Sequence, residues 1–438
     1  MTAQNSGQDA SPLRLGIAGL GTVGTGTVKI LQRHAALLAT RAGRPISVTA
    51  VSARSRAKNR DIDLSGYAWE DDPRSLAVRD DVDVFVELVG GDEGVAREAV
   101  TAALKAGKDV VTANKALLAI HGQELAELAE ANGCVLRFEA AVAGGIPVIK
   151  TMTESLAGND IRRVMGVMNG TCNYILTRME NAGLPYDTVF EEARQLGYLE
   201  ADPTLDVGGI DASHKLAILA SIAFGTRPTF GAVEIEGIER VSIDDIRRAA
   251  DMGYRIKLLG VAQMTGRGLE QRMSPCLVPA DSPLGQLQGG TNMVVIEGDS
   301  VGQIVLRGAG AGEGPTASAV LSDIVEIARG VRMPAFAQPA SQLSTPVSAR
   351  TAVPAAYYLR LQLADKPGAL AKVATVLGDA GVSIDRMRQY GKHDTEGVAP
   401  VLIVTHKTTP EAIDLAIEAL PRTGVIHGEP VELRIEEV

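Results

Sequence analysis

Short apolar runs alternate with stretches of helical periodicity over residues 13–140. The apolar runs are LRLGIAG, ISVTAVS, VDVFVELVG, KDVVTA and CVLRFEAAV, and their continuous hydrophobicity is typical of strands buried on both faces. Apolar residues recur at helical spacing between them, over residues 23–38, 95–105 and 123–131. Regular alternation of strand and helix predicts an α/β domain with a doubly wound parallel sheet, which we place at residues 1–150.

The pattern changes beyond residue 150. The segment MGVMNGTCNYILTRMENAG and the helical pattern of residues 211–224 are mixed with the alternating segments LLGVAQMT, MVVIEG and QIVLRG. This mixture predicts an α+β domain over residues 151–309, with helices on one side of its sheet. A glycine-rich loop and a helix follow, and we expect residues 310–335 to pack back against the first domain.

The C-terminal part is predicted to be a separate small module. Residues 333–354 contain four prolines and little periodicity, which indicates a linker, placed at 336–354. Beyond it, over residues 355–438, the pattern reads strand, helix, strand, strand, helix, strand. This order is typical of a ferredoxin-like module.

Composition narrows the range of functions. The chain has 438 residues, 45% hydrophobic and 22% charged, as expected for a globular protein of several domains. A net charge of −10 disfavours a nucleic-acid partner, and the three cysteines form no framework of disulfides or metal ligands. The polar N-terminus lacks a signal-peptide layout, and no apolar run is long enough for a membrane span. We therefore expect a cytoplasmic protein with no membrane partner.

The sequence GLGTVG lies between the first strand and the first helix. In this position Gly19 permits a tight turn, Gly21 lets the backbone approach a pyrophosphate, and Gly24 allows close packing of helix and strand. Thr22 and Val23 then open a helix whose N-terminus attracts phosphate. The alternative is a structural turn, but the placement favours a Rossmann-type dinucleotide site.

The residues after the second strand suggest which nicotinamide cofactor is bound. An acid at this position would bind a free ribose 2′-hydroxyl, whereas here SARSRAK places Arg54, Arg56 and Lys58 before the first acid, Asp61. An arginine can stack on adenine and neutralise a 2′-phosphate. The loop could also be merely solvated. We favour NADP, with NAD possible and Arg54 as the residue that distinguishes them.

Carboxylates crowd the segment YLEADPTLDVGGIDASHK, which carries Glu200, Asp202, Asp206 and Asp211 ahead of Lys215. Asp211 and Lys215 are four residues apart and share one helix face, with Asp211 in the first turn. An ordinary exposed ion pair is the alternative. The other acids, downstream of a nucleotide domain, favour an active site in which Lys215 exchanges a proton with an alcohol and the acids bind a cationic substrate group.

Lys115, in VVTANKALL, is a second candidate because it follows a buried strand. The carboxyl ends of parallel strands are where ligands bind in such folds. A lysine here is equally consistent with an ordinary surface position, and the neighbouring Asn114 could simply end the strand and cap a helix.

These segments together resemble the homoserine dehydrogenase family, in its monofunctional form with a C-terminal ACT domain. The resemblance covers essentially the whole chain, through GLGTVG, ELVGG, TANKALL, EAAVAGGIPVI, NGTCNYIL and LGYLEADPTLDVGGIDASHK in the family's order. It implies NAD(P)H-dependent interconversion of L-aspartate 4-semialdehyde and L-homoserine, a step toward threonine, methionine and isoleucine. The rivals are another ACT-bearing amino-acid dehydrogenase and a sensor without catalysis.

The resemblance also implies residue roles. Lys215 would be the catalytic acid/base, supported by Asp211, and Gly312 of the glycine-rich loop would close on the cofactor. Residues expected at the substrate are Glu200, which binds the amino group, with Lys115, Gly197, Tyr198, Asp206 and Thr171. Lys115 is also counted among the cofactor contacts.

Two further ligands follow from the resemblance. A monovalent cation, usually sodium, would be held by Glu139, Val142, Gly144 and Ile146, mostly through backbone carbonyls; the alternative is a glycine-rich turn with no ion. The segment DKPGALAKVATVLGDAGVSID resembles the ACT pattern, which implies L-threonine as an effector and a homodimer or homotetramer. A pairing module that binds nothing is the alternative.

Overall fold

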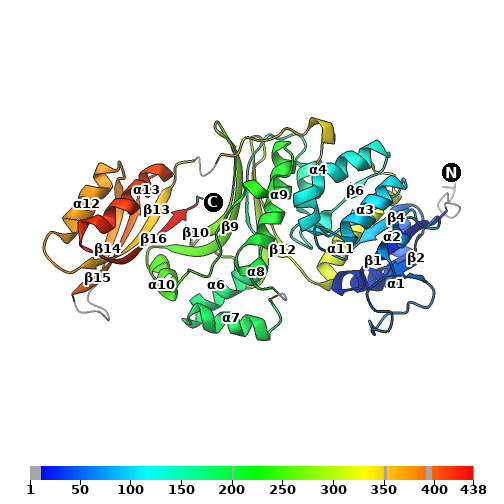
Figure 1. Ribbon diagram of the computed structural model, residues 1–438, viewed down its shortest axis with the longest axis horizontal. Coiled ribbons are helices and arrows are strands. Elements are labelled where there is room, and N and C mark those ends of the chain that lie inside the picture. Colours follow the sequence, from blue (N-terminus) through cyan, green and yellow to red (C-terminus); the bar gives the residue numbers. More distant parts are fainter. Residues whose placement is uncertain (1–10, 200–201, 350–352, 391–396, 438) are drawn as a thin grey trace, which may run out of the picture. The chain divides into compact units, whose positions relative to one another are not determined.

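The computed structural model describes residues 11–199, 202–349, 353–390 and 397–437 (Figure 1). The chain divides into two compact units, each assembled from three separate stretches. The first comprises residues 1–170, 211–233 and 290–346, and the second comprises residues 171–210, 234–289 and 347–438.

The first unit is built on a parallel six-stranded sheet with the strand order β3-β2-β1-β4-β5-β6. The order reverses at β1, which confirms the predicted doubly wound sheet. The strands are β1 (Leu13–Ala18), β2 (Ile46–Ser52), β3 (Ala68–Glu70), β4 (Val84–Glu87), β5 (Asp109–Thr112) and β6 (Leu136–Arg137). Its helices are α1 (Thr22–Ala42), α2 (Pro73–Ala77), α3 (Val95–Lys105) and α4 (Lys115–Ala131).

Three details of this sheet differ from the predicted pattern. Helix α4 begins at Lys115 rather than near residue 123, because the Asn114 side chain caps the backbone N–H of Leu117. The short pair β3 and α2 was not predicted, although Asp72 caps α2. Strand β6 has only two residues, because Glu139–Ala141 turn into a 3₁₀ helix.

Helix α11 (Glu313–Ala328) packs beside α1 in the first unit (Figure 1). Leu321 and Ile324 of α11 share one core cluster with Leu31 of α1 and Ile17 of β1. The glycine-rich loop before α11 is therefore held near the glycine turn at the start of α1.

The same unit contains the antiparallel strands β7 (Ile161–Val167), β11 (Thr291–Gly298) and β12 (Gly302–Ala309), with β11 in the middle. It also contains most of α9 (Ile210–Phe224), the helix predicted over residues 211–224. The short helical segments are α5 (Val148–Lys150), a single π-helical turn Thr151–Ser155, and Phe230–Ala232.

The second unit has a sheet that runs β9-β10-β16-β13-β15-β14, with β8 also paired to β10. The helices and strands of this unit before residue 290 are α6 (Gly170–Ala182), α7 (Tyr186–Gln195), α8 (Thr204–Val207), β8 (Glu234–Ile235), α10 (Ile243–Asp251), β9 (Tyr254–Thr265) and β10 (Gly268–Pro279). The first turn of α6 is thus on the same unit as the long β9–β10 hairpin.

The C-terminal module has the predicted ferredoxin-like order of elements. It consists of β13 (Ala356–Ala364), α12 (Ala369–Asp379), β14 (Ile384–Gln389), β15 (Val398–Thr405), α13 (Pro410–Ala419) and β16 (Ile426–Ile435). Gly368 adopts φ +81° in the turn between β13 and α12, a left-handed conformation that glycine adopts at no steric cost. Leu359, Val373 and Ile413 join the sheet and both helices in one apolar core.

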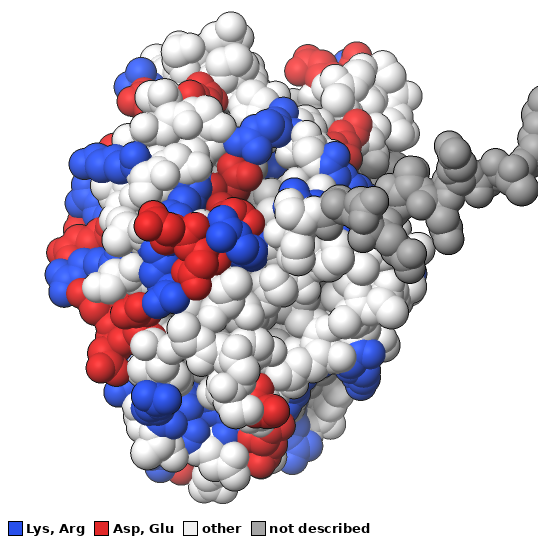
Figure 2. Space-filling view, turned by 90° about the vertical axis from the view of Figure 1, so that its right-hand side faces the viewer, with Lys and Arg blue, Asp and Glu red and all other residues white. Residues whose placement is uncertain are grey.

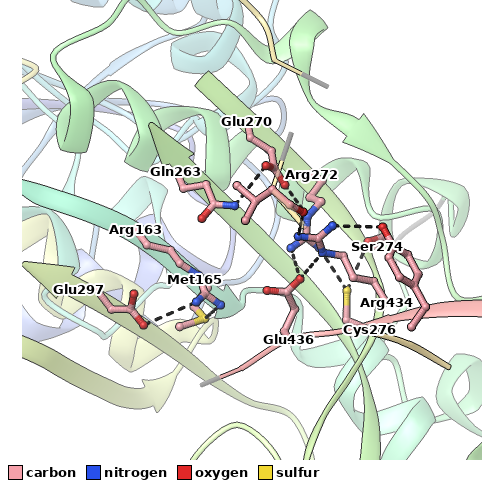
Figure 3. Close-up of polar contacts among 12 residues, drawn as sticks. Arg163, Met165, Gln263, Glu270, Arg272, Ser274, Cys276, Glu297, Arg434 and Glu436 are labelled. Carbon is pink, nitrogen blue, oxygen red and sulfur yellow. Dashed lines mark hydrogen bonds and ion pairs between the residues drawn. The ribbon is translucent and has the colours of Figure 1, made fainter. Parts of the chain in front are cut away.

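This module shares a sheet with the β9–β10 hairpin, because β16 pairs in parallel with β10 at Cys276↔Arg434 and Leu277↔Ile435. Buried ion pairs reinforce the contact (Figure 3). The Glu436 carboxylate accepts from Arg434 Nε at 2.6 Å and from Arg272, which also contacts Glu270 at 3.1 Å. The module is therefore joined to the hairpin through backbone and side chains.

The predicted linker is anchored to the rest of the chain at intervals, through the buried residues Phe336, Ala340, Leu343 and Ala349. Phe336 is buried and contacts Phe138, with 5.3 Å between ring centroids. Arg227 N–H donates to the Ser344 carbonyl at 2.9 Å. Buried apolar residues explain why this proline-rich stretch is anchored. None of the described helices combines the length and hydropathy needed to cross a bilayer.

Candidate active site

The glycine turn leaves the N-terminus of α1 open. Gly19 has φ +99°, and a Cβ there would lie 2.3 Å from the Leu88 carbonyl oxygen. A Cβ at Gly24 would lie 1.9 Å from the Gly19 oxygen. At Gly21 a Cβ would meet nothing within 4 Å, and no side chain among the described residues caps this helix end. The N–H groups of Thr22 and its neighbours are thus available to a phosphate.

The basic loop after β2 is tied to this turn by Arg60, which the sequence did not single out. Arg60 donates to the carbonyls of Leu20 at 3.0 Å and Ser55 at 2.7 Å. Arg54 is exposed in the same loop, directly after β2. The face of the molecule in Figure 2 mixes acidic and basic side chains outside the grey atoms. A local basic loop beside the glycine turn is well suited to an anionic ribose substituent.

A buried carboxylate orders the carboxyl ends of β4 and β5. Glu87 is fully buried, and its Oε1 accepts from the N–H groups of Val89 at 2.8 Å and Gly90 at 2.9 Å. The Thr112 hydroxyl donates to Glu87 Oε2 at 2.5 Å and accepts from Asn114 N–H at 2.9 Å. These bonds fix Asn114, the N-cap of α4, and therefore the start of the helix that carries Lys115.

The structure brings Lys115, Asp211 and Lys215 together. Lys215 Nζ lies 2.7 Å from Asp211 Oδ2, and Lys115 Nζ lies 2.8 Å from Asp211 Oδ1. Lys215 also donates to the Met168 carbonyl at 2.8 Å and is 9% exposed, so it does not extend into solvent. Burial alone would raise the pKa of Asp211, but the ammonium groups of Lys215 and Lys115 outweigh it and hold that pKa well below its ordinary value.

His214 lies in the same region and was missed by the sequence analysis. Its ring contacts Phe230, with 4.2 Å between centroids. Burial lowers the pKa of His214, and the Asp211 charge opposes this shift only in part. The lowered pKa favours a neutral imidazole at neutral pH. The sequence signal for His214 was its position directly before Lys215 in the helical pattern of residues 211–224.

The other substrate residues that the sequence predicted lie around the first turn of α6, in the second unit. The Thr171 hydroxyl donates to the Tyr198 carbonyl at 2.9 Å, and the Cys172 thiol contacts the Asp206 carbonyl at 3.2 Å. The Tyr198 ring stacks on Tyr174 at 4.5 Å, and Gly197 has φ +77°. Asp206 is buried. Glu200 lies outside the described residues.

Glu139 of the predicted cation loop is buried and uses its side chain to cap a helical turn. Its carboxylate accepts from the N–H groups of Ile149 at 3.0 Å and Lys150 at 2.8 Å. Its own N–H donates to Asp323 at 2.8 Å. Burial and the Asp323 charge raise the pKa of Glu139 to about 8, against these hydrogen bonds and Lys150, and burial raises the pKa of Asp323 to about 6.

The backbone of this loop offers oxygen donors. Ala143 and Gly144 adopt φ +55° and +52°, and none of the hydrogen bonds given by the described residues uses the carbonyls of Val142 or Gly144. The Ile146 carbonyl accepts from Val148 N–H. Hard oxygen donors of this kind suit a sodium ion. A Cβ at Gly144 would lie 2.5 Å from the Gly310 oxygen, so the loop closely approaches the glycine-rich segment that ends at Gly312.

Family models match three parts of the chain. The model described as homoserine dehydrogenase matches residues 147–325, and that described as homoserine dehydrogenase, NAD binding domain, matches residues 19–139. A model described as ACT domain matches residues 357–422.

Complete proteins and solved structures are similar over nearly the whole chain. A homoserine dehydrogenase from Pseudomonas aeruginosa is 44% identical over 98% of this chain and 99% of its own. The crystal structure of a homoserine dehydrogenase from Thiobacillus denitrificans is 40% identical, with a TM-score of 0.91 over 98% and 99% of the two chains. A hyperthermophilic archaeal homoserine dehydrogenase in complex with NADPH is 28% identical, with a TM-score of 0.63 over 74% and 99%.

Proposed function

The chain belongs to the homoserine dehydrogenase family of NAD(P)-dependent oxidoreductases, and we propose that it interconverts L-aspartate 4-semialdehyde and L-homoserine. The observation that carries the proposal is the buried Lys215, held by Asp211 and by the Met168 carbonyl. An ammonium group has three N–H donors, and these two contacts use two of them. The third is available for a substrate oxygen.

The reduction needs a hydride and a proton at the same carbonyl group, and a bound nicotinamide would supply the hydride. Lys215 donates the proton to the oxygen that becomes the homoserine hydroxyl, and takes it back in the oxidation. Asp211 stays ionised between two ammonium groups and fixes the direction of the Lys215 donor. Lys115 adds a second positive charge that stabilises negative charge on the reacting oxygen or on the substrate carboxylate.

The substrate's amino acid end would be bound by the segment around Tyr198. We assign this role to Thr171, Gly197, Tyr198 and Asp206, together with Glu200. Three of these, Thr171, Tyr198 and Asp206, lie on the first turn of α6 or are hydrogen-bonded to it. Acidic side chains in this segment suit an ammonium group.

The cofactor is assigned as NADPH in preference to NADH. Strand β2 ends at Ser52 and is followed by Arg54, so an acid that would bind a free 2′-hydroxyl is missing there. Gly19, Gly21, Thr22, Val23 and Gly24 would hold the pyrophosphate, and Gly312 would lie over the cofactor. Backbone carbonyls of Glu139, Val142, Gly144 and Ile146 would hold a sodium ion.

The organisation and regulation that we propose follow the same family. Residues 1–150 with 310–335 form the nucleotide domain, 151–309 the catalytic and pairing domain, 336–354 the linker and 355–438 the ACT domain. The protein would act in the synthesis of threonine, methionine and isoleucine as a homodimer or homotetramer. Threonine would inhibit it by binding one conformational state better than another.

Absorbance at 340 nm tests the activity directly. The purified protein is expected to oxidise NADPH with L-aspartate 4-semialdehyde, and Lys215→Ala is expected to lose turnover by about a hundredfold or more while still binding NADPH. Absence of turnover in the unmodified protein would dismiss the assignment, and unchanged turnover in Lys215→Ala would remove Lys215 from the mechanism. Adding threonine to the same assay tests the inhibition.

A further inference from the structure

Lys257, near the start of β9, has a buried ammonium group with no part in the mechanism above. The residue is 3% exposed, and its Nζ donates to Asn173 Oδ1 at 3.0 Å and to the Leu287 carbonyl. The amide of Asn173 in turn donates to the Gly289 carbonyl at 2.7 Å. Lys257 and Asn173 thus join β9, the turn at residues 287–289 and the first turn of α6.

Burying a lysine here is costly. Burial lowers the pKa of Lys257 to about 8, with the nearby Glu180 opposing this and Arg255 reinforcing it. Glu180 and Arg255 are paired with each other at 2.6 Å, so the Glu180 charge is largely compensated. An apolar side chain of similar length would fill the space without this cost. The position of the hydrogen bonds, rather than stability, therefore explains the lysine.

The turn of α6 that Lys257 anchors also contacts the segment proposed to bind the substrate, residues 197–199 and 202–206, which we call the substrate segment. The two residues before Asn173 are Thr171 and Cys172, which contact the carbonyls of Tyr198 and Asp206. Three successive residues of one helical turn thus form four side-chain bonds, two to the substrate segment, one to Lys257 and one to the Gly289 carbonyl. A small rotation of this turn would displace both carbonyls.

We propose that Lys257 is a positioning residue, which orients the first turn of α6 through Asn173 and so sets the positions of Tyr198 and Asp206. The proposal rests on the proposed function for the identity of the substrate. The contacts themselves do not depend on that identity.

Replacing Lys257 by methionine tests the proposal, because the substitution should change KM for the semialdehyde much more than KM for NADPH. Lys257→Met is expected to raise KM for L-aspartate 4-semialdehyde by about tenfold, with KM for NADPH changed less than about twofold. Arg267→Met is the control, because it removes an exposed positive charge from the turn after β9, where Arg267 pairs with the exposed Glu411, and it should leave both constants near their original values. Equal changes in both KM values, or none, would overturn the proposal.

A second variant keeps the test decisive if Lys257→Met folds poorly. In the unmodified protein, KM for the semialdehyde should rise as the pH increases through about 8, where Lys257 loses its proton. Asn173→Asp places a carboxylate beside the ammonium group, favours its charged form, and should shift this rise to higher pH. A purely structural role for Lys257 predicts no shift, and that result would contradict us.

Hydrogen–deuterium exchange separates this proposal from the assignment of the substrate. Lys257→Met should change amide exchange in residues 170–174 and 197–199 but not in β1 or α9. Above pH 8, Asn173→Asp should differ from the unmodified protein in the same residues. Altered exchange in a protein that does not reduce the semialdehyde would refute the proposed function and support the positioning role. Unaltered exchange in an active protein would refute the positioning role alone.

Discussion

Lys115, the first residue of α4, places its ammonium group 2.8 Å from Oδ1 of Asp211, in the first turn of α9. The other oxygen of the same carboxylate is 2.7 Å from Lys215. One negative charge therefore lies between two positive charges, and the trio has a net charge of about +1 when both lysines are protonated. Such a group attracts a carboxylate or a developing alkoxide, and it depends on the charge of Asp211.

Asp211→Asn should show this dependence. The substitution keeps the shape of the side chain but removes the charge that separates two ammonium groups in a buried site, so the lysines repel and the direction of the Lys215 donor is lost. We expect kcat to fall by at least about tenfold, with NADPH affinity little changed. Steady-state rates at 340 nm and NADPH fluorescence titration measure the two quantities. A full loss of NADPH binding would point instead to a misfolded nucleotide domain.

Arg54→Ala tests the preference between cofactors. Removing a guanidinium from a 2′-phosphate should raise KM for NADPH by about tenfold or more, while KM for NADH changes by less than about twofold. Arg74→Ala, at an exposed arginine that pairs with Asp72 and Glu98, is a suitable control. Equal effects of Arg54→Ala on both nicotinamides would mean that Arg54 does not bind the 2′-phosphate.

Thr112→Val tests the buried network that starts α4. Without the hydroxyl, one oxygen of the buried Glu87 and the N–H of Asn114 lose a partner, which should cost about 1–3 kcal/mol of unfolding free energy. The displaced N-terminus of α4 should also lower kcat/KM for the semialdehyde. Thr112→Ser retains the hydroxyl and should behave like the unmodified protein in urea denaturation and in the assay. If valine and serine variants are alike, the network does not position Lys115.

Glu139→Gln should change how stability depends on pH. The pKa of Glu139 is about 8 in the folded protein, above the ordinary value of 4.5, so the folded state holds this proton more tightly than the unfolded chain between those values. The contribution of Glu139 to stability is therefore complete below about pH 4.5 and is lost as the pH rises to about 8. Glutamine does not titrate, so the difference in Tm between unmodified protein and variant should shrink or reverse from pH 5 to pH 8.

Melting curves at four pH values in this range, in buffer without sodium, measure the effect. Glu124→Gln, at an exposed residue, should keep the pH dependence of the unmodified protein. A constant difference between Glu139→Gln and the unmodified protein at every pH would mean that Glu139 does not titrate here.

Local rules predicted the parts of the site that lie close together in the sequence. The spacing of Asp211 and Lys215 places them on one helix face, and the structure shows the pair at 2.7 Å. GLGTVG predicted the turn between β1 and α1 for the same reason, because its three glycines act within a single loop. Asn114 was considered able to end the strand and cap a helix, and in the structure it caps α4.

Contacts between distant segments were beyond the reach of the sequence pattern. Nothing in TANKALL shows that Lys115 meets Asp211, since that pairing depends on the packing of α4 and α9. Glu87 appeared as part of an apolar strand, and its buried role emerges only when β4 and β5 are adjacent. Lys257 lies directly before LLGVAQMT, the segment expected to alternate, and period alone does not identify a buried ammonium group there.

The pairing of β16 with β10 has a mechanical consequence for the C-terminal module. A domain on a free tether can swing without breaking backbone hydrogen bonds, but here such a swing would tear the ladder that begins at Cys276 and Arg434. A displacement of the module would therefore also act on β10 and on β9, its hydrogen-bonded neighbour. A chain that ended before β16 would leave this edge of β10 unpaired, and an unpaired strand edge can pair with other chains.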